Sequence, residues 1–281
     1  MPDSVASPLV IISAPNGAKL QKSDHPAVPL SPEELADCAE SLLPRGVSVL
    51  HLHVRDDHGG HTLDAGRYRE AIAAIRERVG ERLVLQVTTE AVGHYDRWQQ
   101  MALVRELRPE AVSLALRELC PDRAALDEAG EFFRELQEER IWPQFILYSP
   151  AEAARFDALR QDGYFGHERP FALLVLGRYD DSEEGSPAGL EKFMAAAEVD
   201  AFPWAVCCIG SREGEAVRYA AELGGHVRIG FESNRLLPDG APATDNAQLI
   251  TEQLKLVAAS GASQRRVACA EWVRANLAGM E

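Results

Sequence analysis

The chain has 281 residues, of which 46% are hydrophobic, and its formal net charge is −15. No stretch approaches the ~20 consecutive apolar residues of a membrane span, and no Lys/Arg cluster forms the basic patch of a nucleic-acid binder. The composition therefore favours a soluble, cytoplasmic protein without membrane or nucleic-acid partners. Because no C-x-x-C motif is present, the five cysteines are expected to be reduced thiols, with at least one of Cys207 and Cys208 buried.

Eight short apolar runs organise the chain. Residues 1–8 precede them and lack the basic start and apolar core of a signal peptide, so we expect a short flexible arm there. The runs are nearly continuous, which is typical of strands buried on both faces. They span residues 9–15, 47–56, 82–89, 111–116, 142–148, 171–177, 203–210 and 226–232.

The gaps between these runs have room for one helix each. Ser31 and Glu34 form a capping box with Pro32 at the first helical position, which predicts a helix over residues 31–43. Apolar spacing predicts a helix over 68–78, and closing helices over 246–259 and 263–277. Eight strand–helix units without a G-x-G-x-x-G motif after the first strand favour a closed barrel. We therefore predict an α/β fold, a single (β/α)8 TIM barrel over residues 9–281.

The second predicted strand carries His51 and His53, which point to the same side because strand side chains alternate. Glu232 ends the eighth strand, which lies close to the second once the barrel closes. Two imidazoles and one carboxylate with an open position are a catalytic zinc pattern. We therefore predict a divalent ion, zinc first, on these three residues. The alternative is a pair of packed, hydrogen-bonded histidines.

Further polar residues lie at the strand ends that would form the mouth of the barrel. Arg228 shares the face of Glu232, where it either holds a carboxylate or orients a base; the alternative is a salt bridge that fixes the barrel floor. The candidates for substrate and acid–base roles are Asn16, Lys19, Thr88, Glu90, Ser113, Arg117 and Glu118. Taken singly, such residues are more often turn formers or caps than ligands.

Two neighbours of the histidine pair permit more than one interpretation. Asp56 and Arg55 are a candidate pair that would hydrogen-bond the histidines and orient them. His58 and His61 lie in a turn-like segment and are expected to be solvated rather than additional ligands.

Several motifs resemble those of one family. They are PLSPEE at residues 29–34, HLHVRD at 51–56, GGHVRIGFE at 224–232 and NAQL at 246–249. The chain resembles the β-keto acid cleavage enzymes, which include 3-keto-5-aminohexanoate cleavage enzyme, over almost its whole length. The resemblance implies a zinc-dependent barrel that converts a β-keto acid and acetyl-CoA into acetoacetate and a new CoA ester. It also implies a homo-oligomer, a tetramer.

Residue by residue, the resemblance makes His51, His53 and Glu232 the zinc ligands and Arg228 the arginine that orients the base. It places Thr88 and Ser113 among the hydroxyls that line the site. The resemblance also shows a departure at the base itself. The family commonly has Glu-Asp-Asn where this chain has Glu232-Ser233-Asn234, and a serine is no carboxylate base at neutral pH.

Further departures concern the substrate and the base. The aminohexanoate enzyme has Glu at the position of Lys19 and a small residue near Arg117, so we expect a small anionic keto acid rather than one with an ammonium group. Glu90 and Glu118 are the candidates to replace the missing base.

Two other functions stay open. One is a zinc hydrolase on the same barrel, in which a metal-bound water is the nucleophile. The other is a non-catalytic homologue that binds a small carboxylate.

Overall fold

A closed parallel barrel forms the centre of the molecule. The computed structural model describes residues 7–166, 169–178 and 184–279. Its eight barrel strands pair in the order β1-β10-β9-β8-β7-β6-β5-β2 and close on themselves. They are β1 (Ile11–Ser13), β2 (Val49–Leu52), β5 (Val84–Thr88), β6 (Ala111–Ala115), β7 (Trp142–Leu147), β8 (Phe171–Leu176), β9 (Trp204–Cys208) and β10 (His226–Ile229). A separate hairpin, β3 (Val54–Arg55) and β4 (His61–Thr62), follows β2.

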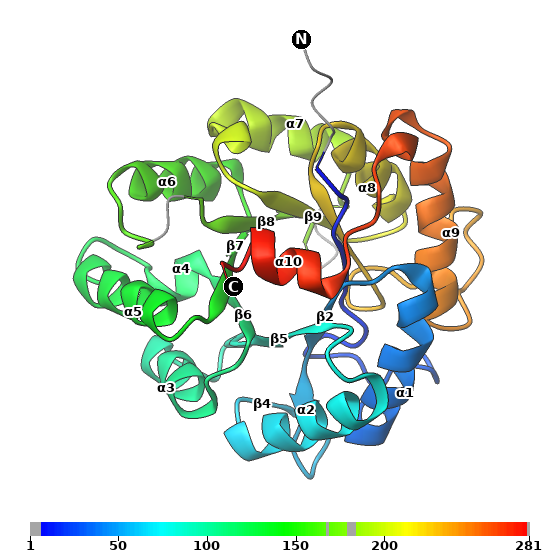
Figure 1. Cartoon of the computed structure of the whole chain (residues 1–281), viewed down its shortest axis with the longest axis horizontal. Coiled ribbons are helices and arrows are strands. Elements are labelled where there is room, and N and C mark those ends of the chain that lie inside the picture. Colours follow the sequence, from blue (N-terminus) through cyan, green and yellow to red (C-terminus); the bar gives the residue numbers. More distant parts are fainter. Residues whose placement is uncertain (1–6, 167–168, 179–183, 280–281) are drawn as a thin grey trace.

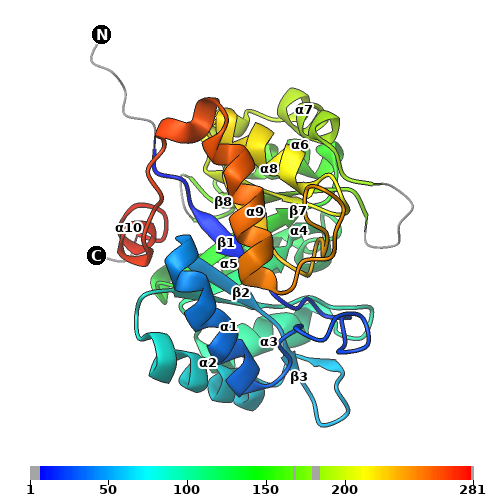
Figure 2. The ribbon, with the colours of Figure 1, turned by 90° about the vertical axis from the view of Figure 1, so that its right-hand side faces the viewer.

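Helices surround the barrel, as Figures 1 and 2 show. Ser31 and Glu34 form the predicted capping box at the first of them, with hydrogen bonds in both directions. The α-helices are α1 (Pro32–Leu42), α2 (Ala65–Val79), α3 (Arg97–Leu107), α4 (Leu116–Leu119), α5 (Leu126–Glu138), α6 (Pro150–Gln161), α7 (Pro187–Ala196), α8 (Glu213–Glu222), α9 (Asn246–Ala258) and α10 (Ala270–Asn276). Three short 3₁₀ helices, η1 (Leu43–Arg45), η2 (Val199–Ala201) and η3 (Gly261–Gln264), complete the set for the described residues.

The strand and helix assignments confirm the predicted TIM barrel, with one correction near the end of the chain. The expected helix over 263–277 is broken into η3 and α10. Its middle is extended because Leu9 bonds to it twice: the Leu9 amide donates to Arg266 O and the Ala268 amide donates to Leu9 O. Residues 1–6 of the predicted N-terminal arm lie outside the described residues.

Hydrophobic side chains pack in two shells. One lies between the barrel and the surrounding helices, and the other fills the barrel from inside, with Ile12, Phe171 and Ala205 among its members. Val273 of α10 belongs to this inner shell, and α10 lies across the amino-terminal end of the barrel (Figure 1). The site must therefore open at the other end, where the strands finish.

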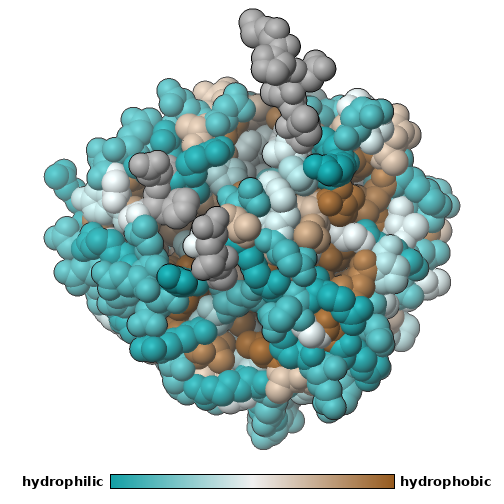
Figure 3. Space-filling view, in the orientation of Figure 1, coloured by the Kyte–Doolittle hydropathy of each residue, from teal (hydrophilic) through white to brown (hydrophobic). Residues whose placement is uncertain are grey.

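The face of the molecule that carries α10 is mostly polar. On the α10 face, hydrophilic residues cover most of the area and hydrophobic residues show in separate patches (Figure 3). No helix among the described residues has the length and apolarity to cross a membrane.

Candidate metal centre and active site

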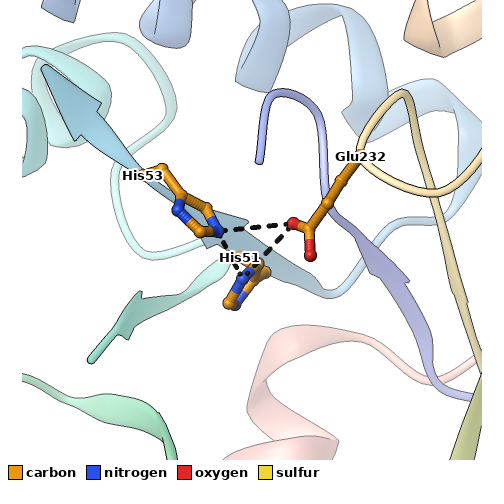
Figure 4. A group of neighbouring side chains, drawn as sticks. All are labelled: His51, His53 and Glu232. Atoms are coloured by element: carbon orange, nitrogen blue, oxygen red, sulfur yellow. Dashed lines mark hydrogen bonds and ion pairs between the residues drawn. The ribbon is translucent and has the colours of Figure 1, made fainter. Parts of the chain in front are cut away.

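Three predicted ligands meet at the carboxyl ends of β2 and β10. The Nε2 atoms of His51 and His53 lie 3.2 Å apart, and Glu232 Oε2 lies 3.5 Å from the first and 3.4 Å from the second (Figure 4). All three side chains are buried. Among the described residues, these three form the group of His, Cys, Asp and Glu side chains that converges closely enough for a metal ion.

The spacing of these atoms fits a tetrahedral ion. Bonds of about 2.0–2.1 Å to zinc place two ligand atoms about 3.3–3.4 Å apart in a tetrahedron, and the three observed separations lie close to that value. Three protein ligands leave one position for water or substrate, which is the catalytic form of a zinc site. The donor set therefore fits the ion predicted from the sequence.

Neighbouring amides fix the histidines. His51 Nδ1 lies 2.9 Å from Gln86 Oε1, which can only accept, so Nδ1 carries the proton and Nε2 faces Glu232 with its lone pair. Asn16 bonds both backbone groups of His53, by Nδ2 to its carbonyl (2.8 Å) and by Oδ1 to its amide (3.2 Å). Burial lowers the pKa of His51 to about 4 and of His53 to about 3, so both are neutral at pH 7, as metal ligands must be.

A close contact between β10 and β1 places Glu232. A Cβ on Gly230 would lie 2.2 Å from the carbonyl oxygen of Ala14, so only glycine lets the strands approach there. The Glu232 amide then donates to the same Ala14 oxygen (3.1 Å). Gly17, at φ +57°, packs against the Glu232 side chain from the β1–α1 loop.

Arg228 lies beside the candidate metal ligands inside the barrel. Its guanidinium donates to Glu232 Oε1 (3.0 Å) and to Cys207 Sγ (3.2 Å). Burial by itself would raise the pKa of Glu232, but the neighbouring Arg228 guanidinium holds it well below its usual range. Glu232 is therefore an anion next to two neutral imidazoles, which is the charge state that binds a divalent cation.

The two candidate bases lie in different surroundings. Glu90 is half-buried, with Oε2 3.9 Å from His53 Nδ1. Burial, followed by repulsion from Glu232 and Glu118, raises the Glu90 pKa to about 7. Glu118 instead accepts from Gln100 Nε2 (2.6 Å) and from the Ala91 amide (3.3 Å), so it anchors the loop after β5.

Two cavities meet at Glu90 and Glu232. The inner cavity measures about 10 Å³, which is room for about one water molecule; its lining includes His51, Thr88, Ser113, Tyr148 and Arg228. The Ser113 hydroxyl there is buried without a hydrogen-bond partner among the described residues. The outer cavity measures about 420 Å³ and opens outward; its lining includes Gly17, Lys19, Ser211, Ser233 and Arg235.

The remaining predicted residues divide between these cavities and other places. Ser233 lines the outer cavity, with Oγ 3.0 Å from Cys207 Sγ, and Cys207 and Cys208 are both buried. Arg117 stacks on the Tyr148 ring at 3.7 Å, behind the inner cavity. The Asn16 amide is fully buried and bonded to backbone, including Pro29 O, so it positions His53 and would contact substrate only if one of these bonds opened.

Two predictions about the histidine surroundings were wrong. Arg55 and Asp56 do not support the histidines: Arg55 donates to the carbonyls of Gly17 and Leu20, and Asp56 accepts from amides of its own turn. His58 is exposed as expected, but His61 is half-buried, with its ring 5.1 Å from that of His53. The β3–β4 hairpin causes this, because it folds His61 back over the strand end.

Three residues of the candidate site were not predicted from the sequence. Gln86 pairs in register with His51 on the neighbouring strand. Placing the two predicted strands side by side would have brought these residues together. Tyr148, just past β7, and Arg235, just past β10, lie at the carboxyl end of the barrel. The sequence around each is that of an ordinary loop.

A TIM barrel with these side chains at its carboxyl end defines a barrel enzyme with a candidate metal centre. Comparison with known proteins then gives the family. A sequence model of the beta-keto acid cleavage enzymes matches residues 8–278, and the chain belongs to that family. This confirms the resemblance and the prediction of an enzyme.

Relatives carry related activities in their names. The chain is 29% identical over 260 residues to a 3-keto-5-aminohexanoate cleavage enzyme of Fusobacterium nucleatum, covering 88% of this chain and 90% of the relative. It is 24% identical over 254 residues to a 3-oxoadipate:acetyl-CoA acetyltransferase of Cupriavidus necator, covering 88% of each. Among solved structures, ObcA in ternary complex with a C4-CoA adduct and oxalate superimposes with a TM-score of 0.72 at 16% identity, covering 90% of this chain and 67% of ObcA. That likeness supports the fold.

Proposed function

We propose that this protein is a zinc-dependent enzyme that exchanges acyl groups between a β-keto acid and acetyl-CoA, giving acetoacetate and a new CoA ester. His51, His53 and Glu232 would hold the ion, and its Lewis acidity would polarise the keto oxygen of the substrate. The observation that carries the proposal is the tetrahedral spacing of these three ligands beside an inner cavity lined by Arg228. A cytoplasmic homotetramer is part of the proposal and rests on composition and on the family resemblance.

The side chains around the inner cavity suit the oxygen atoms of a keto acid. Arg228 supplies a cation, and the hydroxyls of Thr88 and Ser113 supply short polar contacts. The unpartnered Ser113 hydroxyl supports a bound polar group, since a buried hydroxyl without a partner costs about 1–3 kcal/mol.

Glu90 is the residue we propose as the base. The reaction must remove a proton from the carbon between the keto and carboxylate groups, and Glu90 lines both cavities beside the metal ligands. Its pKa near 7 suits a group that takes and returns a proton at neutral pH. Ser233, at the position where the family commonly has Asp, faces Cys207 and has no carboxylate to offer.

The first experiment incubates zinc-loaded protein with acetyl-CoA and a panel of β-keto acids, and detects acetoacetate and the new acyl-CoA by mass spectrometry. We expect turnover in the wild type and a loss of kcat of about 100-fold or more in Glu90→Gln. Glu118→Gln is the matched control. Because Glu118 anchors a loop, we expect its kcat to fall less than about 10-fold, as for the loss of one hydrogen bond away from the reacting groups.

Other outcomes would contradict the proposal. Turnover that survives in Glu90→Gln with full zinc content would show that another group is the base. A wild type that forms no acyl-CoA from any keto acid but hydrolyses a carboxylic ester or amide would favour the zinc hydrolase. Binding of keto acids without any turnover would favour the non-catalytic homologue.

A further inference from the structure

The outer cavity carries two cations, Lys19 and Arg235. Lys19 comes from the β1–α1 loop and Arg235 from the β10–α9 loop. The cavity therefore lies between loops that follow the first and the last strand of the barrel. Neither side chain forms a hydrogen bond or an ion pair within the described part of the chain. In a chain of net charge −15, two such cations on one cavity are available to an anion from solution.

Both cations lie on loops that hydrogen bonds hold in place. Arg55 donates to the carbonyls of Gly17 and Leu20, on either side of Lys19. Asn234 bonds both backbone groups of Leu236, by Nδ2 to its carbonyl (2.7 Å) and by Oδ1 to its amide (2.9 Å), and so fixes the turn around Arg235. Because the backbone at both positions is held, an anion that binds there has to order only the two side chains.

The cavity also adjoins the metal centre. Glu90 and Glu232 line it, and Gly17, two residues before Lys19, packs on the Glu232 side chain. Arg235 follows the metal ligand Glu232 by three residues. A molecule whose keto oxygen binds at the metal ligands would therefore extend its other end into the outer cavity that Lys19 and Arg235 line, and about 420 Å³ is room for a chain of several carbons.

Resting on the proposed function, we infer that the substrate is a dicarboxylic β-keto acid and that Lys19 and Arg235 bind its second, distal carboxylate. The guanidinium of Arg235 offers paired donors that match a carboxylate, and Lys19 adds a point charge. The phosphates of CoA are the other anions in the reaction. They are less suitable, because the long pantetheine arm separates them from the reacting thioester, whereas this cavity borders the metal ligands.

The test compares 3-oxoadipate with 3-oxohexanoate, which has the same six carbons but lacks the second carboxylate. Calorimetry with zinc-loaded protein in the absence of acetyl-CoA measures the Kd of each. We expect the wild type to prefer 3-oxoadipate by about 10-fold or more, as one charged hydrogen bond provides. Arg235→Gln and Lys19→Gln should each weaken 3-oxoadipate about 10-fold and change 3-oxohexanoate by less than about twofold.

Controls identify what each cation recognises. Arg235→Lys should retain part of the preference, since it keeps the charge and loses the paired donors. Arg45→Gln removes an exposed arginine in the segment that precedes β2, at the opposite end of the barrel, and should change neither Kd.

Equal binding of the two keto acids by the wild type would overturn the inference. So would an Arg235→Gln variant whose KM rises for acetyl-CoA but not for acetyl-pantetheine, because the cations would then serve the CoA phosphates. A preserved preference for 3-oxoadipate in binding, without any turnover, would instead refute the proposed reaction and leave the carboxylate subsite standing.

Discussion

At the scale of single residues, the three side chains of the candidate metal site could be predicted, but the residues that support them could not. The alternation of strand side chains puts His51 and His53 on one side, and that geometry is local. Gln86 reaches His51 only through the pairing of β2 with β5, a register that depends on the closed barrel. Asn16 and His53 are likewise brought together by tertiary structure, 37 residues apart.

The Gln86–His51 contact gives a prediction at this scale. Replacing Gln86 by Leu keeps the approximate volume and removes the acceptor for His51 Nδ1–H, so the ring is no longer held with Nε2 toward the metal. We expect the Kd for zinc to rise about 10–100-fold, the usual effect of losing such a partner. Competition with a chromophoric chelator measures it. Gln144→Leu, a change in another fully buried glutamine of the barrel, is the control, and an equal effect in both variants would contradict a specific role for Gln86.

At the scale of secondary structure, patterns of apolar residues predicted every barrel strand correctly, and the capping box predicted the first helix. The prediction of one helix over 263–277 was wrong. The apolar spacing is helical, but the middle of the segment is extended because it pairs with Leu9. The outcome is a short α10 that fills the amino-terminal end of the barrel. Arg274 anchors it, donating to Glu110 Oε1 (2.5 Å), to Glu81 O (2.8 Å) and to Leu83 O (3.0 Å).

Removing this anchor should destabilise the fold without affecting the metal. In Arg274→Ala the three acceptors lose a half-buried cationic donor, although Glu110 keeps Arg76. We expect the free energy of unfolding to fall by about 1–3 kcal/mol in urea denaturation, with an unchanged Kd for zinc. Arg266→Ala, an exposed arginine in the same segment, should stay within about 0.5 kcal/mol of the wild type. A matching loss in both variants would show that α10 is not anchored through Arg274.

At the scale of the whole molecule, the candidate metal site joins the first and last parts of the barrel sequence. β1 lies between β2, which carries the histidines, and β10, which leads to Glu232. The sequence predicted this meeting because eight strands must close in a ring. It could not predict the two cavities, since their walls are loops whose course depends on contacts such as Arg55 with Gly17.

Because its ligands come from residues 51, 53 and 232, a bound ion should stabilise the whole barrel rather than one loop. An ion that binds only the folded state adds RT ln(1 + [L]/Kd), or about 2.7 kcal/mol when free zinc is 100 times its Kd. For a domain of this size, that corresponds to a Tm increase of about 5–10 °C relative to chelator-treated protein. Calorimetry with and without zinc measures the shift, and elemental analysis verifies removal of the ion. His51→Ala, which lacks one ligand, should show little of the increase, whereas Arg45→Gln should show all of it. If the chelated and zinc-loaded wild types melted at the same temperature, the three side chains would not form a metal site, because ligands on opposite sides of β1 cannot share an ion without coupling β2 to β10.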